Sequence, residues 1–170
     1  MTLRLDDMDV WLEAALDHIR DQLRANPAVG VKSSNGAKVI EVGTLPIGEL
    51  AKHPDGEPSI WMTPLKSRPD RAGNTIDHYV EFEVQVFTNA AMQDLQKFID
   101  AQKDHRKMVG RVWSHVLNLR DAGIDAGKWQ DWWPTGEVEW VQVPIGDRAL
   151  LGGSMRFTML VEKVWVEANP

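Results

Sequence analysis

The stretch Asp77–Ala90, DHYVEFEVQVFTNA, alternates apolar and polar side chains with a period of two. One side of the alternation holds Val80, Phe82, Val84 and Val86, and the other holds Glu81, Glu83 and Gln85. This pattern predicts a strand with one buried face and one polar face. We therefore expect a strand over 76–87 whose apolar row lies on the core of the protein.

Two segments carry apolar residues at helical spacing. The first, about 7–25, ends at the dipeptide Asn26-Pro27 and predicts an amphipathic N-terminal helix. The second, 90–120, follows Asn89, which stands where a helix cap is expected. A polar interval at 102–107 predicts either one bent helix or two helices in tandem.

Shorter apolar runs predict four further strands, at 37–42, 59–63, 137–143 and 152–168. Between them, residues 44–58 read as a loop with one helical turn at 47–51. Residues 64–75 carry two prolines and a glycine, which predicts an exposed hairpin loop, and 121–136 predicts a Trp-rich loop.

The resulting order is α-β-β-β-α-β-β. Hairpin-length connections favour a mostly antiparallel sheet with both helices packed on one face, which is an α+β fold. At 170 residues the whole chain, 1–170, is expected to form a single domain.

Composition excludes several classes of function. Nineteen Lys and Arg against twenty-five Asp and Glu give a net charge of -6, which disfavours binding to a phosphate backbone as the main activity. The chain has no cysteine, so disulfides, thiolate nucleophiles and Cys-ligated zinc are excluded. The N-terminus lacks the pattern of a signal peptide, and no apolar run is long enough to span a membrane.

Candidate catalytic groups do not assemble into a known pattern. His78 near Glu81 and Glu83 is the best candidate for a metal or acid/base site, but in a strand it faces away from both carboxylates. The two glutamates share a face about 7 Å apart, and we interpret that face as wetted or turned to another subunit. No nucleophile elbow or phosphate-binding loop occurs, so we expect no catalytic residue, cofactor or metal, and no enzyme activity.

Two further groups of side chains stand out. Trp129, Trp132, Trp133 and Trp140 suggest either an aromatic platform for a ligand, or a loop held over the helix by its rings, or an interface anchor. The second group is the cations of the predicted hairpin loop, Lys66, Arg68 and Arg71, in a chain that is otherwise acidic.

The order of elements resembles the tail terminator, or tail completion, proteins of long-tailed bacteriophages. The resemblance lies in DDMDVWLEAALDHIRDQL (6–23), in the pattern from IWMTPLKSRPD to KFIDAQ (60–102), and in GSMRFTMLVEKVWV (153–166). It covers most of the chain as a layout rather than as an invariant signature. The Trp-rich loop at 127–136 is longer than the pattern suggests.

The resemblance implies a non-enzymatic structural protein that forms a hexameric ring. Such a ring caps the tail tube, stops its polymerisation and offers the surface for joining to the head. The implied partners are further copies of the chain, the tail tube protein and the head-tail connector, with DNA passing through the lumen without specific binding. The implied location is the virion tail, assembled in the host cytoplasm.

A ring needs two different matching surfaces on each copy, because head-to-tail contacts are heterologous. We expect Glu81 and Glu83 to face either Arg68 or Arg71 of a neighbour, or Arg156 and Lys163 of the same chain. The candidate interface residues are Lys66, Arg68, Arg71, Glu81, Glu83, Arg156, Trp132 and Trp133. The alternative is a small α+β cone of the nuclear-transport-factor type, which would bind a small molecule or perform acid/base chemistry.

Overall fold

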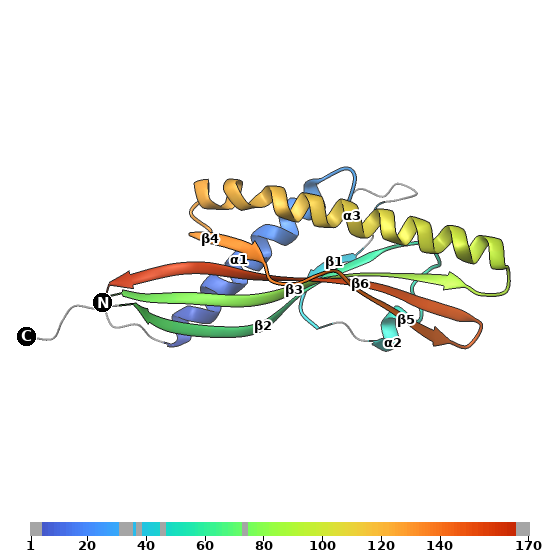
Figure 1. The fold of residues 1–170 in the computed structure, drawn as a ribbon, viewed down its shortest axis with the longest axis horizontal. Coiled ribbons are helices and arrows are strands. Elements are labelled where there is room, and N and C mark those ends of the chain that lie inside the picture. Colours follow the sequence, from blue (N-terminus) through green and yellow to red (C-terminus); the bar gives the residue numbers. More distant parts are fainter. Residues whose placement is uncertain (1–4, 31–35, 37–38, 45–46, 73–74, 166–170) are drawn as a thin grey trace, which may run out of the picture.

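The computed structural model describes residues 5–30, 36, 39–44, 47–72 and 75–165. The elements are α1 (Leu5–Ala25), β1 (Val39–Val42), α2 (Ile47–Leu50), β2 (Ser59–Ala72), β3 (Thr75–Ala91), α3 (Leu95–Asp125), β4 (Asp131–Pro134), β5 (Glu139–Ile145) and β6 (Arg148–Trp165) (Figure 1). The α+β class is thus confirmed, with the N-terminal helix, the long central helix and the mostly antiparallel sheet in the expected order. Parts of the predictions for 32–42, 64–75 and 152–168 lie outside the described residues.

One sheet contains all six strands. Its main path runs β1-β2-β3-β6-β4, and β5 also pairs with β6. β4 pairs with residues 157–160 of β6 and β5 with residues 148–154, so the two short strands follow one another along the same edge. The pair β1–β2 is parallel and the other pairs are antiparallel.

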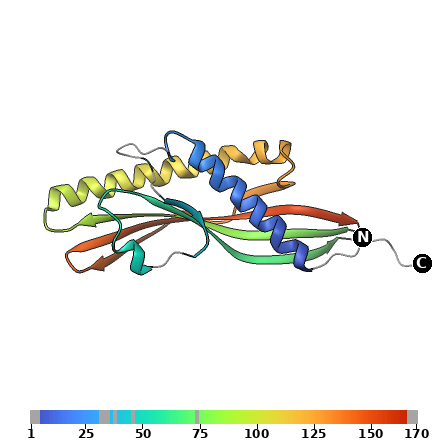
Figure 2. The ribbon, with the colours of Figure 1, turned by 180° about the vertical axis from the view of Figure 1, so that it is seen from behind.

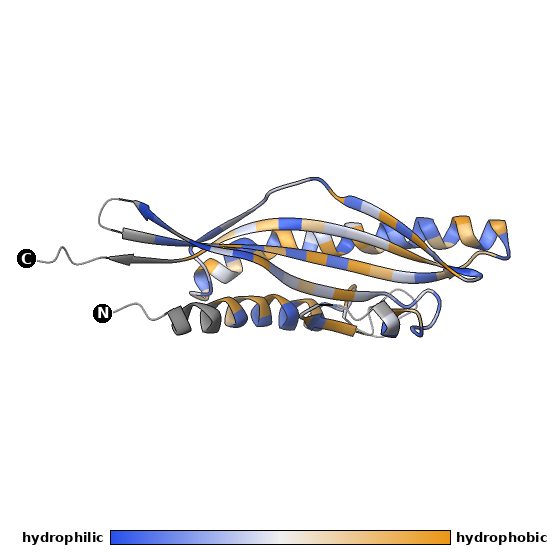
Figure 3. Cartoon of the chain, turned by 90° about the horizontal axis from the view of Figure 1, so that it is seen from below, coloured by the Kyte–Doolittle hydropathy of each residue, from blue (hydrophilic) through white to orange (hydrophobic). Residues whose placement is uncertain are grey.

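The core lies between the sheet and the two long helices, which sit on the same side of it (Figures 1 and 2). The predicted apolar row of β3 is confirmed as the centre of this core, since Val80, Phe82, Val84 and Val86 are each at most 1% exposed. Leu16, Ile19 and Leu23 of α1, with Val109, Val112 and Val116 of α3, pack in the same cluster. Figure 3 shows the opposite face of the sheet, which neither α1 nor α3 covers.

The β2–β3 hairpin is longer than the sequence predicts. Residues 64–72 belong to β2 and pair with β3, so the prediction of a loop over 64–75 was wrong. β1 pairs only with Ser59–Met62, and beyond that point β2 is an edge strand. A proline in an edge strand can direct its nitrogen to the unpaired side, which explains how Pro64 and Pro69 fit.

A β-bulge in β2 decides which side chains enter the core. The register shifts between Pro64 and Lys66, which leaves Leu65 without an opposite residue on β3. Without this extra residue, Lys66 and Arg68 would share the face of the buried Ile60 and Met62. The bulge instead places both cations on the uncovered face of the sheet.

The long helix α3 begins later than predicted and is continuous. Asp94, not Asn89, is the N-cap, and its carboxylate accepts a hydrogen bond from the Lys97 N–H at 3.1 Å. Asn89 remains in β3, where its amide donates to the carbonyls of Leu50 at 2.6 Å and His53 at 2.7 Å. These bonds hold the short α2 segment against the uncovered face at the far end of the sheet.

The polar interval at 102–107 does not bend α3, which runs for 31 residues. Within the interval, His105 faces the core and its charged neighbours face solvent. A single inward residue at helical spacing is enough to continue the apolar stripe from Ala101 to Met108. The polar run is therefore the solvent side of one helix.

The segment predicted as a Trp-rich loop is mostly structured. α3 extends to Asp125, and Asp131–Pro134 forms β4. Trp129 is 1% exposed and its Nε1 donates to the Arg120 carbonyl at 2.8 Å, so it does hold the chain against the end of α3. A β-carbon at Gly123 would lie 1.8 Å from the Trp129 ring, so only glycine fits beside it.

Two glycines of α3 give a matched test of this packing. Gly110 has open space around an added β-carbon, whereas Gly123 meets the Trp129 ring. We expect Gly110→Ala to stabilise the fold by about 0.5–1 kcal/mol through helix propensity. We expect Gly123→Ala to destabilise it by about 1–3 kcal/mol through overpacking. Urea unfolding of the two variants checks this, and equal effects would contradict the packing.

Candidate functional site

The uncovered face of the sheet carries a row of side chains that crosses it near the turn of the β2–β3 hairpin. Arg68 of β2 lies over the ring of Tyr79 in β3, 5.5 Å from its centroid. Tyr79 in turn meets Trp133 of β4 edge-on, with ring centroids 6.3 Å apart. Arg68 and Trp133 are both exposed. The row therefore presents one cation and two aromatic rings to any molecule that docks on this face.

The two glutamates of β3 behave differently. Glu83 is opposite Arg156 on β6, with Nε of Arg156 3.7 Å from the carboxylate, and it also accepts a bond from the Gln85 amide at 2.8 Å. It is 8% exposed. Of the two sets of partners expected for Glu83, the structure shows the one in the same chain, through Arg156. Glu81 is opposite Lys66 on β2 and Thr158 on β6 and is partly exposed.

His78 is buried near the start of β3. It is 4% exposed, and its Nε2 lies 2.9 Å from the Ser67 hydroxyl. It shares the inner face with Val80 and thus points away from Glu81 and Glu83, as period-two geometry predicts. Burial lowers the pKa of His78. Across the described residues, no group of three or more His, Asp or Glu side chains is placed to hold a metal ion.

The two adjacent tryptophans of β4 separate into core and surface. Trp132 is 2% exposed, and its ring is stacked with that of Phe82 at 6.1 Å and tilted against that of Phe157 at 5.0 Å. It belongs to the core and is unsuitable as a surface contact. Trp133 points to the opposite face and is 40% exposed. Alternation along a strand explains this split, and Trp133 alone of the pair remains an interface candidate.

The two edges of the sheet near the turn of the β2–β3 hairpin carry different charges. Residues 64–72 on the β2 edge have three cations and one acid, a net charge of +2 (3 − 1). Residues 120–139, which end α3, form β4 and reach Glu139 of β5, have two cations and five acids, a net charge of -3 (2 − 5). Each edge also has an exposed apolar side chain, Leu65 and Trp133 respectively.

These two edges lie at the same level along the strands. Trp133 is opposite Thr158, Thr158 is opposite Glu81, and Glu81 is opposite Lys66. A copy placed beside another without a shift would thus bring a basic edge against an acidic edge. We call these surfaces the basic edge (residues 64–72) and the acidic edge (residues 120–139).

β5 is the most apolar exposed strand of the described structure. Trp140 and Val141 are each 52% exposed and Val143 is 42% exposed. Sequence reasoning predicted the strand but did not single out Val141 and Val143. Their alternation looks the same whether a strand lies inside a sheet or at its edge, so the sequence offers no signal for this exposure.

Two grooves flank α3 and meet at His105. One, of about 400 Å³, runs between α3 and β3 and is bordered by Thr88, Asn89, Asp100 and Asp104. The other, of about 290 Å³, runs between α3 and β5 and is bordered by Gln102 and Trp140. His105 is 4% exposed, and its Nδ1 bonds to the Thr88 hydroxyl. Neither groove gathers the side chains of a recognisable catalytic site.

Burial sets the charge state of His105. It lowers the pKa from 6.5 to about 4, against a smaller raising effect from a backbone hydrogen bond at Gly152. The imidazole is therefore neutral in the folded protein at neutral pH.

No known protein family matches the sequence, and no characterised protein is significantly similar to it. In the parts of the chain that the structure describes, no helix has the length and apolar character needed to cross a membrane.

The buried imidazole predicts a pH dependence of stability. Unfolded His105 takes up a proton near pH 6.5, but the folded form does so only near 4, so the unfolded state binds more protons between these values. We expect the unfolding free energy to fall by up to about 3 kcal/mol as the pH drops from 7 to 4. His105→Asn, which keeps a partner for Thr88, should flatten this slope in chemical denaturation. Equal slopes in the two proteins would contradict a neutral buried imidazole.

Proposed function

We propose that this chain is a structural protein of the bacteriophage tail, a tail terminator that forms a hexameric ring. The ring would cap the tail tube, stop its polymerisation and provide the surface for joining to the head. Its partners would be further copies of the chain, the tube protein and the head-tail connector. DNA would pass through the lumen without specific binding.

The pair of complementary sheet edges carries this proposal. A closed ring needs two different surfaces that match on adjacent copies. The basic edge and the acidic edge differ in charge, sit at the same level and each expose one large apolar residue. Charge complementarity orients such a contact and suppresses wrong pairings, while Leu65 and Trp133 would supply buried apolar area.

The uncovered sheet face supports the same proposal. The row Arg68–Tyr79–Trp133 ends at both edges, so it would be continued by the neighbouring copies of a ring. Aromatic and arginine side chains are the types most enriched in protein interfaces. The earlier idea that Glu83 contacts a neighbour's arginine has less support, because Arg156 and Gln85 already bind its carboxylate.

Charge reversal tests the ring contact. Lys66→Glu with Arg68→Glu converts the basic edge to an acidic one, so like charges would face each other. We expect assembly to weaken by about tenfold or more, since each 1.4 kcal/mol is tenfold and like-charge contacts cost several kcal/mol. Native mass spectrometry and light scattering, with and without tail tubes, measure the loss of rings.

The matched control is Lys103→Glu with Lys107→Glu, the same change of charge on the solvent side of α3, where each lysine has an i,i+3 acid partner. It should leave assembly unchanged. Unaltered rings in the basic-edge variant, or equal losses in both variants, would rule out the proposed contact.

The alternative proposal is a small-molecule-binding or acid/base cone. The groove of about 400 Å³ beside α3, with Thr88, Asp100 and Asp104 on its border, supports it. Against it, Val80, Phe82, Val84 and Val86 form the middle of the inward row of β3 and are each at most 1% exposed, so this part of the face would offer a ligand no polar group. A monomer or dimer that binds a small molecule in native mass measurements would favour the cone over the ring.

A further inference from the structure

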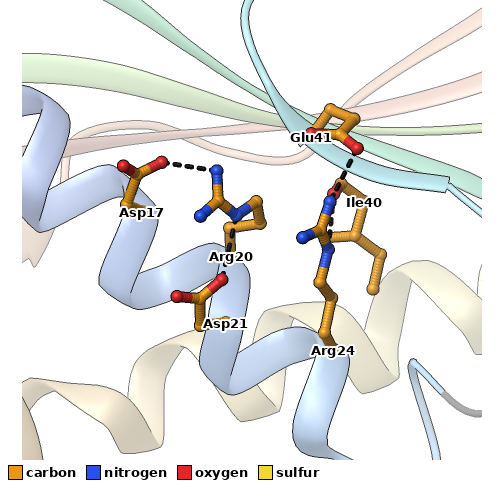
Figure 4. Close-up of polar contacts among 6 residues, drawn as sticks. All are labelled: Asp17, Arg20, Asp21, Arg24, Ile40 and Glu41. Atoms are coloured by element: carbon orange, nitrogen blue, oxygen red, sulfur yellow. Dashed lines mark hydrogen bonds and ion pairs between the residues drawn. The ribbon is translucent and has the colours of Figure 1, made fainter.

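Three strand segments at the borders of the described sheet are protected against pairing. β1 is the first. Gly43 directly follows β1 and its N–H donates to the Met62 carbonyl of β2, so alternation directs the Ile40 carbonyl away from β2. Arg24 of α1 donates to that carbonyl from Nε at 3.0 Å and Nη2 at 2.7 Å, and Nη2 also binds Glu41 at 2.6 Å (Figure 4). The free edge of β1 is thus capped by the chain itself.

The next two segments are protected by their residues. The edge part of β2 contains Pro64 and Pro69 with the exposed Lys66 and Arg68, and β4 spans only four residues and ends at Pro134. Prolines, lysines and short length are the usual means by which proteins prevent strands from pairing at an edge.

β5 differs from the other three. It is seven residues long, EWVQVPI, and within the described structure it pairs with β6 alone. It exposes Trp140, Val141 and Val143, and its one charged residue, Glu139, is at the end of the strand. An exposed apolar edge strand is a template for another strand, and apart from Pro144 the free side of β5 has neither a lysine nor a capping side chain to prevent pairing.

We propose that β5 is a strand-addition site and that its occupant is β5 of a second copy of this chain. The two strands pair antiparallel about a two-fold axis at Gln142, so the sheets of the two copies become continuous. This contact uses the half of the molecule far from the β2–β3 hairpin, shares only Glu139 with the acidic edge, and does not depend on the ring proposed above.

The backbone of β5 suits this register. Pro144 has no N–H and is found in strands where its nitrogen faces the unpaired side. Alternate residues share that direction, so Gln142 and Trp140 also present their backbone groups to the free edge. Pairing about Gln142 lets the two Gln142 residues exchange both N–H···O bonds. Each Trp140 N–H then donates to the Pro144 carbonyl of the other copy.

The side chains match in the same register. Val141 of one copy lies opposite Val143 of the other on the uncovered face, and Trp140 lies opposite Pro144 on the helix face. Glu139 lies opposite Ile145, so no charge meets a like charge. Cross-strand apolar pairs of this kind each stabilise a sheet by about 0.2–1 kcal/mol.

The opposite edge of the sheet is poorly suited to pair with β5 of a second copy. At the level of β5, the opposite edge of the sheet is β1, because Trp140 aligns with Gly153, Val86, Ile60 and Ile40 in turn. That edge is capped by Arg24, and side-by-side placement would put Glu139 against Glu41 at the same level. Self-pairing of β5 avoids both obstacles.

Cysteine cross-linking tests the register directly, because the natural chain has no cysteine. Opposite residues of an antiparallel pair have α-carbons about 4.5–5.5 Å apart, which a disulfide spans. Gln142→Cys is therefore expected to give a covalent dimer under mild oxidation. Ser114→Cys, an exposed position on α3, is the matched control and should give little. Equal cross-linking of the two variants would overturn the proposal.

Proline substitution tests the backbone contact. Gln142→Pro removes an N–H that faces the free edge, so the fold should survive while strand addition is lost. Gln142→Ala keeps the N–H and serves as the control. Sedimentation at several concentrations should show dimers for the wild type and Gln142→Ala, and at least tenfold weaker dimerisation for Gln142→Pro. Undiminished dimers in the proline variant, or a wild type that stays monomeric, would overturn the proposal.

The ring contact and the β5 contact can be tested separately, because a variant that disrupts one should leave the other intact. Loss of rings in the basic-edge variant with retained Gln142→Cys cross-linking supports the β5 contact as distinct from the ring. Loss of this cross-link in the basic-edge variant, with its fold intact by circular dichroism, would overturn the independence of the two contacts.

Discussion

The antiparallel pairing of β3 with β6 is the constraint on which the rest of the structure depends. The two strands stay in register from Thr75 with Trp165 to Ala91 with Arg148, broken once between His78 and Tyr79. Their inner faces supply the centre of the core, where Phe82 and Phe157 stack at 5.2 Å. Fully burying each such side chain stabilises the fold by about 1.5–3 kcal/mol. The helices and the outer strands pack around this pair.

Register explains how the sheet keeps charges out of its core. A one-residue shift moves a whole strand's side chains to the other face. β2 uses a single bulge at Leu65 for this purpose, so its first half buries Ile60 and Met62 while its second half exposes Lys66 and Arg68. The same cations then meet Tyr79 and Glu81 across the strand. The surface that we assign to ring contacts therefore follows from one extra residue.

The surfaces that we propose for contacts with other copies lie where the sheet ends. Inside a sheet, neighbouring strands satisfy every backbone group, but an edge leaves a row of donors and acceptors. Among the described edge segments, this chain caps or interrupts β1, the outer part of β2 and β4, whereas β5 exposes an apolar row. A sheet with one open apolar strand and two oppositely charged edges is suited to association, while the grooves beside His105 lack a recognisable catalytic group.

The sequence alone determined the elements whose pattern is local. Period-two alternation in Val80–Val86 and helical spacing in 7–25 are imposed by backbone geometry, and each identifies the buried side of its own segment. The α+β class follows from their order. Tertiary structure decided what depends on distant neighbours. Pro64 and Pro69 fit in an edge strand, and Asn89 binds the α2 segment instead of capping a helix. Trp132 is buried whereas Trp133 is exposed. It also decided that β5 is an edge strand. The exposure of a strand depends on which strands pair beside it, and the residues within the strand do not determine this.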